Sequence, residues 1–163
     1  MKTLFLMRHA KSSWDNPQLA DFDRPLNQRG LNAAAFMGKL MKERGIEPDL
    51  ILSSPARRAA HTAQIVKREA QLLAEISYDE KIYEASPFTL LYLLKRVDNA
   101  VNSLLLIGHN PGFESLLKLL TSEAHSMPTA ALAKITMPIE NWSDINEHCG
   151  KLEFLIKPKE EMR

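Results

Sequence analysis

Leu4-Phe5-Leu6-Met7-Arg8-His9 is the stretch of the sequence that decides the fold. Its four consecutive apolar residues are typical of a central strand that is buried on both faces of a sheet. The apolar run ends abruptly at Arg8 and His9, so we expect this charged pair to lie at the carboxyl end of the strand. In open α/β sheets, ligands bind at that edge.

Beyond this strand, the chain alternates between strand and helix patterns. Apolar and alternating runs predict further strands over residues 49–52, 76–83, 103–107, 131–137 and 151–157. Helices are expected from a cap at Asn27 to about Arg44, from a serine cap and first-turn proline at Ser53-Ser54-Pro55, from Ser86-Pro87, and from about Phe113. The predicted fold class is α/β, a three-layer α/β/α sandwich with a mostly parallel mixed central sheet, in a single domain over residues 1–163.

The composition limits the classes of function to consider. The 21 basic and 20 acidic residues leave a net charge of +1, which gives no extended field for nucleic acid or an anionic membrane. The first apolar run is too short for a signal peptide, and no other run approaches a membrane span. The single cysteine, Cys149, fits a reducing compartment and lacks neighbours at zinc-site spacing. We therefore expect a cytoplasmic protein, a monomer or weak dimer, with no metal, cofactor, nucleic-acid partner or membrane partner.

Three charged stretches are expected to meet at one edge of the sheet. Arg8 and His9 follow the first strand, Arg57 and Arg58 open the helix after the second, and His109 follows the fourth. A phosphoryl group in transfer needs cationic donors around its oxygens and one nucleophile in line with the leaving group. Taken alone, each residue is better explained as a surface ion pair or as a hydrogen-bonded histidine at a strand end. Their joint placement favours phosphoryl chemistry.

Four ordered blocks of sequence resemble the histidine phosphatase superfamily, which includes the cofactor-dependent phosphoglycerate mutases. They are Leu6-Met7-Arg8-His9-Ala10-Lys11-Ser12 with Trp14, Pro25-Leu26-Asn27-Gln28-Arg29-Gly30, Ser53-Ser54-Pro55 with Arg58-Ala59 and Thr62-Ala63, and Ile107-Gly108-His109-Asn110-Pro111. The short chain, Tyr83-Glu84-Ala85 and Met127-Pro128-Thr129-Ala130 look most like the SixA-type phosphohistidine phosphatases. The resemblance implies a phosphoglycerate mutase-like fold.

The resemblance also implies roles for individual residues. His9 is implied as the nucleophile that forms a phosphohistidine, and Arg8, Arg58 and His109 as the residues that bind the phosphate. The Arg-Ala-x-x-Thr register selects Arg58 over Arg57, and one helical step turns a side chain by about a hundred degrees, so only one of the two should face the pocket. We expect neutral His9 to attack with one ring nitrogen while the other donates to a backbone carbonyl, and a protonated His109 to neutralise charge.

Two further positions, Ala10 and Glu84, bear on catalysis. Ala10 stands where the superfamily usually has glycine, and we expect activity to survive because alanine lacks only easy access to positive φ. Glu84 is the nearest equivalent of a carboxylate that serves as general acid in larger members of the superfamily. A solvated loop residue is an equally open interpretation of Glu84.

The chemistry of the leaving group helps to predict the substrate class. Phosphohistidine expels an imidazole with a pKa of about 6.5, which needs less help from an acid than an alkoxide does. The short chain leaves little material to enclose a small ligand, which favours a phosphohistidine-bearing protein as the partner. A phosphomonoesterase or mutase acting on a small phosphorylated substrate is the first alternative, and a noncatalytic phosphate-binding protein is the second.

Overall fold

Six strands form one mixed sheet at the centre of the protein. A computed structural model describes residues 1–162 of the 163-residue chain. The strands are β1 (Lys2–Arg8), β2 (Leu50–Ser53), β3 (Ile76–Tyr78), β4 (Ser103–Gly108), β5 (Leu132–Met137) and β6 (Lys151–Ile156), in the spatial order β3-β2-β4-β1-β5-β6. The first four pair in parallel, and β5 and β6 pair antiparallel, which confirms the predicted mixed sheet.

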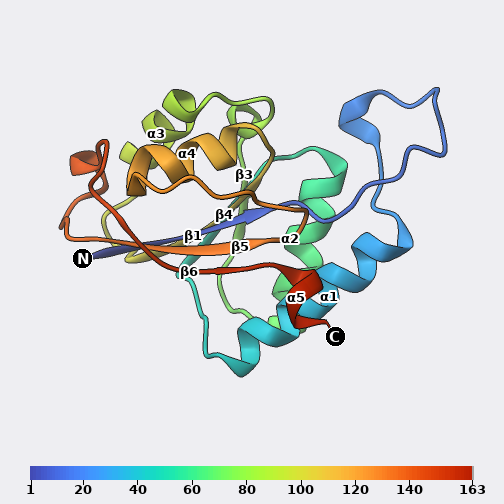
Figure 1. Ribbon diagram of the computed structural model, residues 1–163, viewed down its shortest axis with the longest axis horizontal. Helices are drawn as coiled ribbons and strands as arrows, with labels where there is room; N and C mark the ends of the chain where they lie inside the picture. Colours follow the sequence, from blue (N-terminus) through green and yellow to red (C-terminus); the bar gives the residue numbers. More distant parts are fainter. Residues whose placement is uncertain (163) are drawn as a thin grey trace.

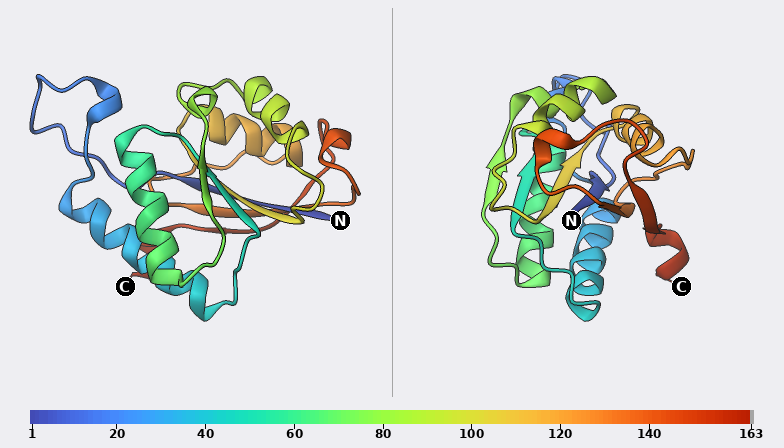
Figure 2. Two further views of the ribbon diagram at one scale, coloured as in Figure 1. Left: turned by 180° about the vertical axis from the view of Figure 1, so that it is seen from behind. Right: turned by 90° about the vertical axis from the view of Figure 1, so that its left-hand side faces the viewer.

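The helices cover both faces of this sheet (Figures 1 and 2). They are α1 (Gln28–Glu43) and α2 (Arg57–Ala70) on one face, α3 (Pro87–Lys95) and α4 (Gly112–Thr121) on the other, and the short α5 (Pro158–Glu161) beside α1. Strand β1 serves both layers, because side chains along a strand alternate between its faces. Phe5 and Met7 pack with α1 and α2, whereas Leu4 and Leu6 pack with α3 and α4. The three-layer sandwich is therefore confirmed.

The helix starts agree with the predicted caps at two places and differ at a third. The side chains of Asn27 and Ser86 cap α1 and α3, as predicted. The predicted serine cap of α2 is wrong, because α2 begins only at Arg57 and no side chain caps it. The Ser54 hydroxyl instead accepts from the amide two residues on, at 3.2 Å, and hydrogen-bonds to His109. Ser54, which was predicted to cap a helix, thus contacts His109 instead.

The segment predicted as one strand over residues 76–83 divides in two. Only Ile76–Tyr78 pairs in the sheet, and Glu80–Ile82 forms a 3₁₀ turn. The side chain of Asp79 accepts from the amide two residues on and turns the chain away from the sheet edge. The short turns at Asp21–Asp23 and Trp142–Asp144, and helix α5, were not expected from the sequence.

The topology brings the carboxyl ends of β1, β2 and β4 side by side. In the register of the sheet, Arg8 at the end of β1 lies opposite Gly108 at the end of β4, and Ser53 at the end of β2 lies opposite Ile107. The long loop after β1 extends from the same edge (Figure 1).

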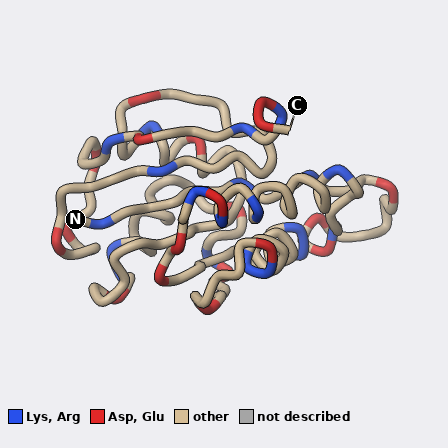
Figure 3. The backbone as a smooth tube through the Cα atoms, turned by 90° about the horizontal axis from the view of Figure 1, so that it is seen from below, with Lys and Arg blue, Asp and Glu red and all other residues tan. Residues whose placement is uncertain are grey.

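Figure 3 shows Lys and Arg interspersed with Asp and Glu along the backbone. Within residues 1–162, no helix combines the length and apolar character needed to cross a membrane.

Candidate active site

The four residues singled out by the sequence lie together in one depression. Arg8, His9, Arg58 and His109 all line a cavity of about 310 Å³ at the carboxyl edge of the sheet. The ring centroids of the two histidines are 5.1 Å apart. Because β1 and β4 are neighbours and end level with each other, segments separated by a hundred residues meet in this pocket.

His9 is held by a hydrogen bond from one ring nitrogen. Its Nδ1 lies 2.7 Å from the carbonyl oxygen of Ala10, and since a carbonyl can only accept, Nδ1 carries the hydrogen. In the neutral ring, Nε2 then keeps its lone pair. Burial, reinforced by three nearby arginines, lowers the pKa of His9 to about 4, although the bond to Ala10 acts in the opposite direction. The ring is therefore neutral at physiological pH, with a free nitrogen.

Ala10 fits its position without a strained backbone. It is fully buried, and its φ is not positive. Its amide donates to the Thr62 hydroxyl at 3.0 Å, and that hydroxyl donates to the carbonyl of Arg58 at 2.7 Å. This chain of hydrogen bonds connects the support of His9 to the first turns of α2.

His109 differs from the sequence-based expectation in its charge. Burial first, and then the neighbouring His9 and Arg58, lower the pKa of His109 to about 3, so the groups of the chain hold this ring neutral. Its Nε2 lies 2.7 Å from the Ser54 hydroxyl, and its buried Nδ1 has no hydrogen-bond partner within residues 1–162. The Ser54 hydroxyl, which accepts the amide hydrogen of Ala56, can either accept from Nε2 or donate to it. In the tautomer in which Ser54 donates, Nδ1 carries the hydrogen of the neutral ring.

Arg58 is oriented by Asp21, a residue that was not predicted from the sequence to belong to the site. Its two terminal nitrogens donate to the backbone carbonyl of Asp21 at 2.7 Å and to the Asp21 carboxylate at 2.9 Å. The same carboxylate accepts from Tyr83 at 2.6 Å and pairs with Arg24 at 2.8 Å. These donors, Tyr83 first, lower the pKa of Asp21 to about 2. Asp21 is therefore an anion that joins the loop after β1 to α2.

Arg57 lies outside the pocket, as the register predicted. It is exposed, and the one hydrogen bond of its side chain within residues 1–162 is a 3.5 Å contact to the Asp23 carbonyl. Arg58 is 7% exposed and lines the depression with the two histidines. The helical step between the two arginines therefore separates a buried position from a solvated one.

Arg8 donates to the carbonyl of Met127 at 3.1 Å, and its buried Nε has no partner within the described part of the chain. Burial lowers the pKa of Arg8, the Glu114 carboxylate raises it, and Arg58 lowers it again. Arginine stays charged despite such shifts because its ordinary pKa is so high. Arg8 thus brings a cation with unused donor capacity to the pocket.

Glu84 lies on the rim rather than in the depression. It is exposed and lines a neighbouring cavity of about 500 Å³ together with Asp21, Arg58, Tyr83 and His109. The backbone of Glu84 has a φ of 55°, in the left-handed region that few side chains adopt. Asp21 and Tyr83 are poor alternatives as a general acid. Asp21 is ionised, and burial followed by the bond to Asp21 raises the pKa of Tyr83 to about 12.

Neither the role of Asp21 nor the contact of Ser54 with His109 was predicted from the sequence. Asp21 sits in a polar loop that gives no local signal, because its partner Arg58 is 37 residues away. Within residues 1–162, no cluster of three or more His, Cys, Asp or Glu side chains could hold a metal ion. The expected absence of metal and cofactor stays a prediction.

Comparisons with known proteins show which family the chain resembles. The family model of the histidine phosphatase superfamily (branch 1) matches residues 4–87. An uncharacterized protein of Mycobacterium tuberculosis strain H37Rv, Rv1276c, is 31% identical over 94% of this chain and 100% of its own length. The crystal structure of the candidate phosphohistidine phosphatase SixA from Agrobacterium tumefaciens superposes with a TM-score of 0.82 at 32% identity, over 96% of this chain and 99% of that chain.

A second solved structure extends the likeness of the fold. The protein histidine phosphatase SixA, in complex with tungstate, superposes with a TM-score of 0.84 at 24% identity, over 98% of this chain and 99% of that chain. Both SixA structures share the phosphoglycerate mutase-like α/β arrangement of the sheet and helices. The chain therefore belongs to the histidine phosphatase superfamily (branch 1) and is a phosphatase.

Proposed function

We propose that this phosphatase removes the phosphoryl group from phosphohistidine on a protein, by way of a phosphohistidine formed on its own His9. The hydrogen bond from His9 Nδ1 to the Ala10 carbonyl carries the proposal, because it leaves Nε2 as the free nucleophile. The lowered pKa keeps that nitrogen unprotonated at physiological pH.

The reaction proceeds in two displacements. His9 Nε2 forms a bond to phosphorus in line with the breaking P–N bond of the substrate, whose electron pair leaves with the substrate imidazole. That imidazole takes up one proton as it departs. Water then attacks the phosphorus of the phosphoenzyme, loses a proton and releases inorganic phosphate, which restores the lone pair of His9.

Three side chains bind the phosphoryl oxygens during both displacements. Arg8 and Arg58 supply fixed cations in a buried pocket, where charge stabilisation is stronger than in water. His109 acts as a neutral donor through Nδ1, because Ser54 occupies its Nε2. This differs from the protonated His109 that the sequence analysis expected.

The leaving group favours phosphohistidine over an alkyl phosphate ester. An imidazole requires weaker acid assistance than an alkoxide, and the candidate general acid Glu84 lies on the exposed rim rather than beside His9. In this proposal Glu84, or water, protonates the departing imidazole. A side-by-side turnover assay with a phosphohistidine peptide and small phosphoesters tests the assignment. We expect the peptide to have the larger kcat/KM, and a larger value for a phosphoester would contradict it.

One observation favours a second candidate function. The cavity beside Glu84, at about 500 Å³, falls in the range of small-molecule sites. A phosphomonoesterase or mutase acting on a small phosphorylated metabolite would place the rest of its substrate there. The same assay separates the two candidates.

A further inference from the structure

A basic cavity lies next to the catalytic depression. It has a volume of about 610 Å³, and its charged lining residues are the cations Arg8, Lys11, Arg29 and Lys159. No carboxylate from residues 1–162 lines it. Arg8, Lys11 and Thr129 also line the depression that holds His9. The two hollows therefore form one continuous surface that runs from His9 towards α5.

Most of the positive charge that lines this cavity has no ion-pair partner within residues 1–162. Lys11, Arg29 and Lys159 are exposed, and none of them forms an ion pair within the described part of the chain. Glu161 on α5 is paired instead with Arg44, at 3.6 Å. Burial lowers the pKa of Arg8, and the Glu114 carboxylate raises it. Within residues 1–162, Lys11, Arg29 and Lys159 are thus available to an anionic ligand.

Two of these cations, Arg29 and Lys11, lie at the start of α1, where positive charge does not serve the stability of the helix. Arg29 lies in the first turn of α1, where the helix dipole disfavours positive charge. Lys11 is held beside that turn, because its carbonyl accepts from the Asn27 amide at 3.0 Å and packs against Gly30. A Cβ at Gly30 would collide with that carbonyl, so glycine is required for the approach. The fold therefore brings two cations together at a helix end that would favour an anion.

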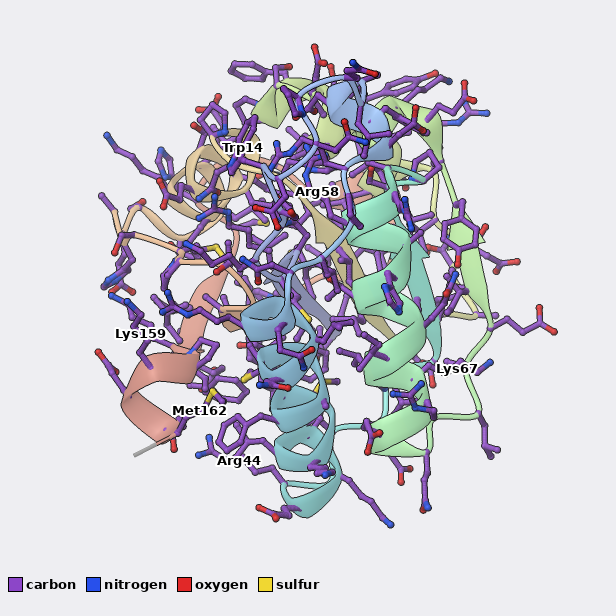
Figure 4. All side chains as sticks on the ribbon, turned by 90° about the vertical axis from the view of Figure 1, so that its right-hand side faces the viewer. Trp14, Arg44, Arg58, Lys67, Lys159 and Met162 are labelled. Atoms are coloured by element: carbon purple, nitrogen blue, oxygen red, sulfur yellow. The ribbon has the colours of Figure 1, made fainter. Side chains whose placement is uncertain are left out.

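The surface around the cavity has the features of a protein-binding face. Trp14 is 75% exposed on the rim of the catalytic depression, with the Arg24 guanidinium 3.3 Å from the centroid of its ring. Met162, at the other end, is 44% exposed. Exposed aromatic and methionine side chains are enriched at protein interfaces. Figure 4 shows Trp14 and Arg58 near the top of one side of the molecule and Lys159 with Met162 lower on the same side, so the surface is extended rather than enclosed.

We propose that the basic cavity binds carboxylates of the polypeptide that carries the phosphohistidine. The substrate is then a protein with acidic side chains close to its phosphorylated histidine. This inference rests on the proposed function. It adds that the substrate protein is acidic around its phosphorylated histidine. Charge pairs at an open site act mainly on association and are screened by salt.

Two matched peptides test the inference. Both carry one phosphohistidine, followed in the first by three glutamates and in the second by three glutamines, and kcat/KM is measured for each at low and high salt. The wild type should prefer the glutamate peptide by roughly fivefold at low salt, as expected for a few exposed charge pairs. The preference should fall towards one in the double variant Arg29→Gln, Lys159→Gln, and in the wild type at high salt.

The control exchanges the same residue types on α2. Lys67 and Arg68 line none of the cavities around the site, and Figure 4 shows Lys67 on the opposite side of α1 from Lys159. The double variant Lys67→Gln, Arg68→Gln should keep the wild-type preference. Thermal unfolding of both double variants checks that they fold.

The outcomes separate this inference from the proposed function. Equal rates for the two peptides in the wild type, or an unchanged preference after loss of Arg29 and Lys159, would overturn the inference while leaving phosphohistidine turnover in place. Failure to hydrolyse either peptide, while a small phosphoester is hydrolysed, would overturn the proposed function, and the inference would fall with it. A preference for the glutamate peptide that disappears in the Arg29, Lys159 variant alone supports both.

Discussion

His9 and His109 occupy equivalent places on neighbouring strands, yet their hydrogen bonds differ. Each follows the last residue of its strand, and those two residues, Arg8 and Gly108, lie opposite each other in the sheet. His9 is bound at Nδ1 by a carbonyl, which leaves Nε2 with a lone pair. His109 is bound at Nε2 by the Ser54 hydroxyl, and its Nδ1 has no partner within residues 1–162. In the proposed reaction, the hydrogen-bond partner of each ring, rather than its place on the strand, separates the nucleophile from the phosphate-binding donor.

Removing the nucleophile should have the largest effect. We expect His9→Ala to lower kcat by about 10³-fold or more, because the covalent pathway is lost and only binding and charge stabilisation remain. Turnover of a phosphohistidine peptide measures the loss, and His61→Ala, on α2 outside the pocket, serves as the control. Retention of more than a tenth of the activity in His9→Ala would contradict the assignment of His9, rather than His109, as the nucleophile.

Removing the donor should have a smaller effect of a different kind. We expect His109→Ala to lower kcat by about 10²-fold, the loss typical of one preorganised donor to a transition-state oxygen. The variant should still form a phosphoenzyme, only more slowly, which rapid-quench labelling with radioactive phosphate can follow. Complete loss of labelling in His109→Ala, with labelling kept in His9→Ala, would reverse the assignment.

The Ser54 hydroxyl offers a finer test of the same comparison. We expect Ser54→Ala to lower kcat by about fivefold, because Nε2 of His109 loses the partner that fixes which nitrogen carries the hydrogen. Ser53→Ala is the matched control, since the Ser53 hydroxyl bonds to the Ser54 carbonyl and not to a histidine. Equal effects of the two substitutions would argue against a specific contribution of Ser54.

The charge of both rings gives the subtlest prediction. Burial lowers the pKa of His9 to about 4 and that of His109 to about 3, so both rings should stay neutral between pH 8 and pH 5. NMR signals of the two imidazoles, identified with His9→Gln and His109→Gln, should not shift over that range. A titration of either ring near pH 6.5 would contradict the account.

The same pKa shifts set the sign of a stability effect. In the unfolded chain a histidine has a pKa of about 6.5, so unfolding takes up protons wherever the native ring stays neutral. The free energy of unfolding should therefore fall as the pH is lowered from about 6.5 towards 4. His9→Gln and His109→Gln should each make that fall shallower in chemical denaturation.

Much of the fold could be predicted from local patterns. The buried run in β1, the cap at Asn27 and the cap at Ser86 each depend on a few adjacent residues, and the structure confirms them. The short β3 and the 3₁₀ turn after it were predicted as one strand, because apolar content does not reveal that Asp79 turns the chain. Boundaries at a sheet edge depend on such side-chain contacts.

In the candidate site, too, some residues could be predicted from the sequence and others could not. The sequence predicted one phosphate site made of four residues, and the structure places all four in one depression: Arg8, His9, Arg58 and His109. Asp21 could not be found, because its contact with Arg58 exists only once the loop after β1 has folded against α2. The charge of His109 also required the structure, since it depends on how deeply the ring is buried.

The covalent step is the central claim, and locating the phosphoryl group tests it most directly. Enzyme quenched in alkali during turnover of a phosphohistidine peptide can be digested and analysed by mass spectrometry, with ³¹P NMR to distinguish the two ring nitrogens. The account predicts one phosphoryl group on Nε2 of His9. A phosphoryl group on His109, on Nδ1 of His9, or no phosphoenzyme at all while turnover continues, would contradict it.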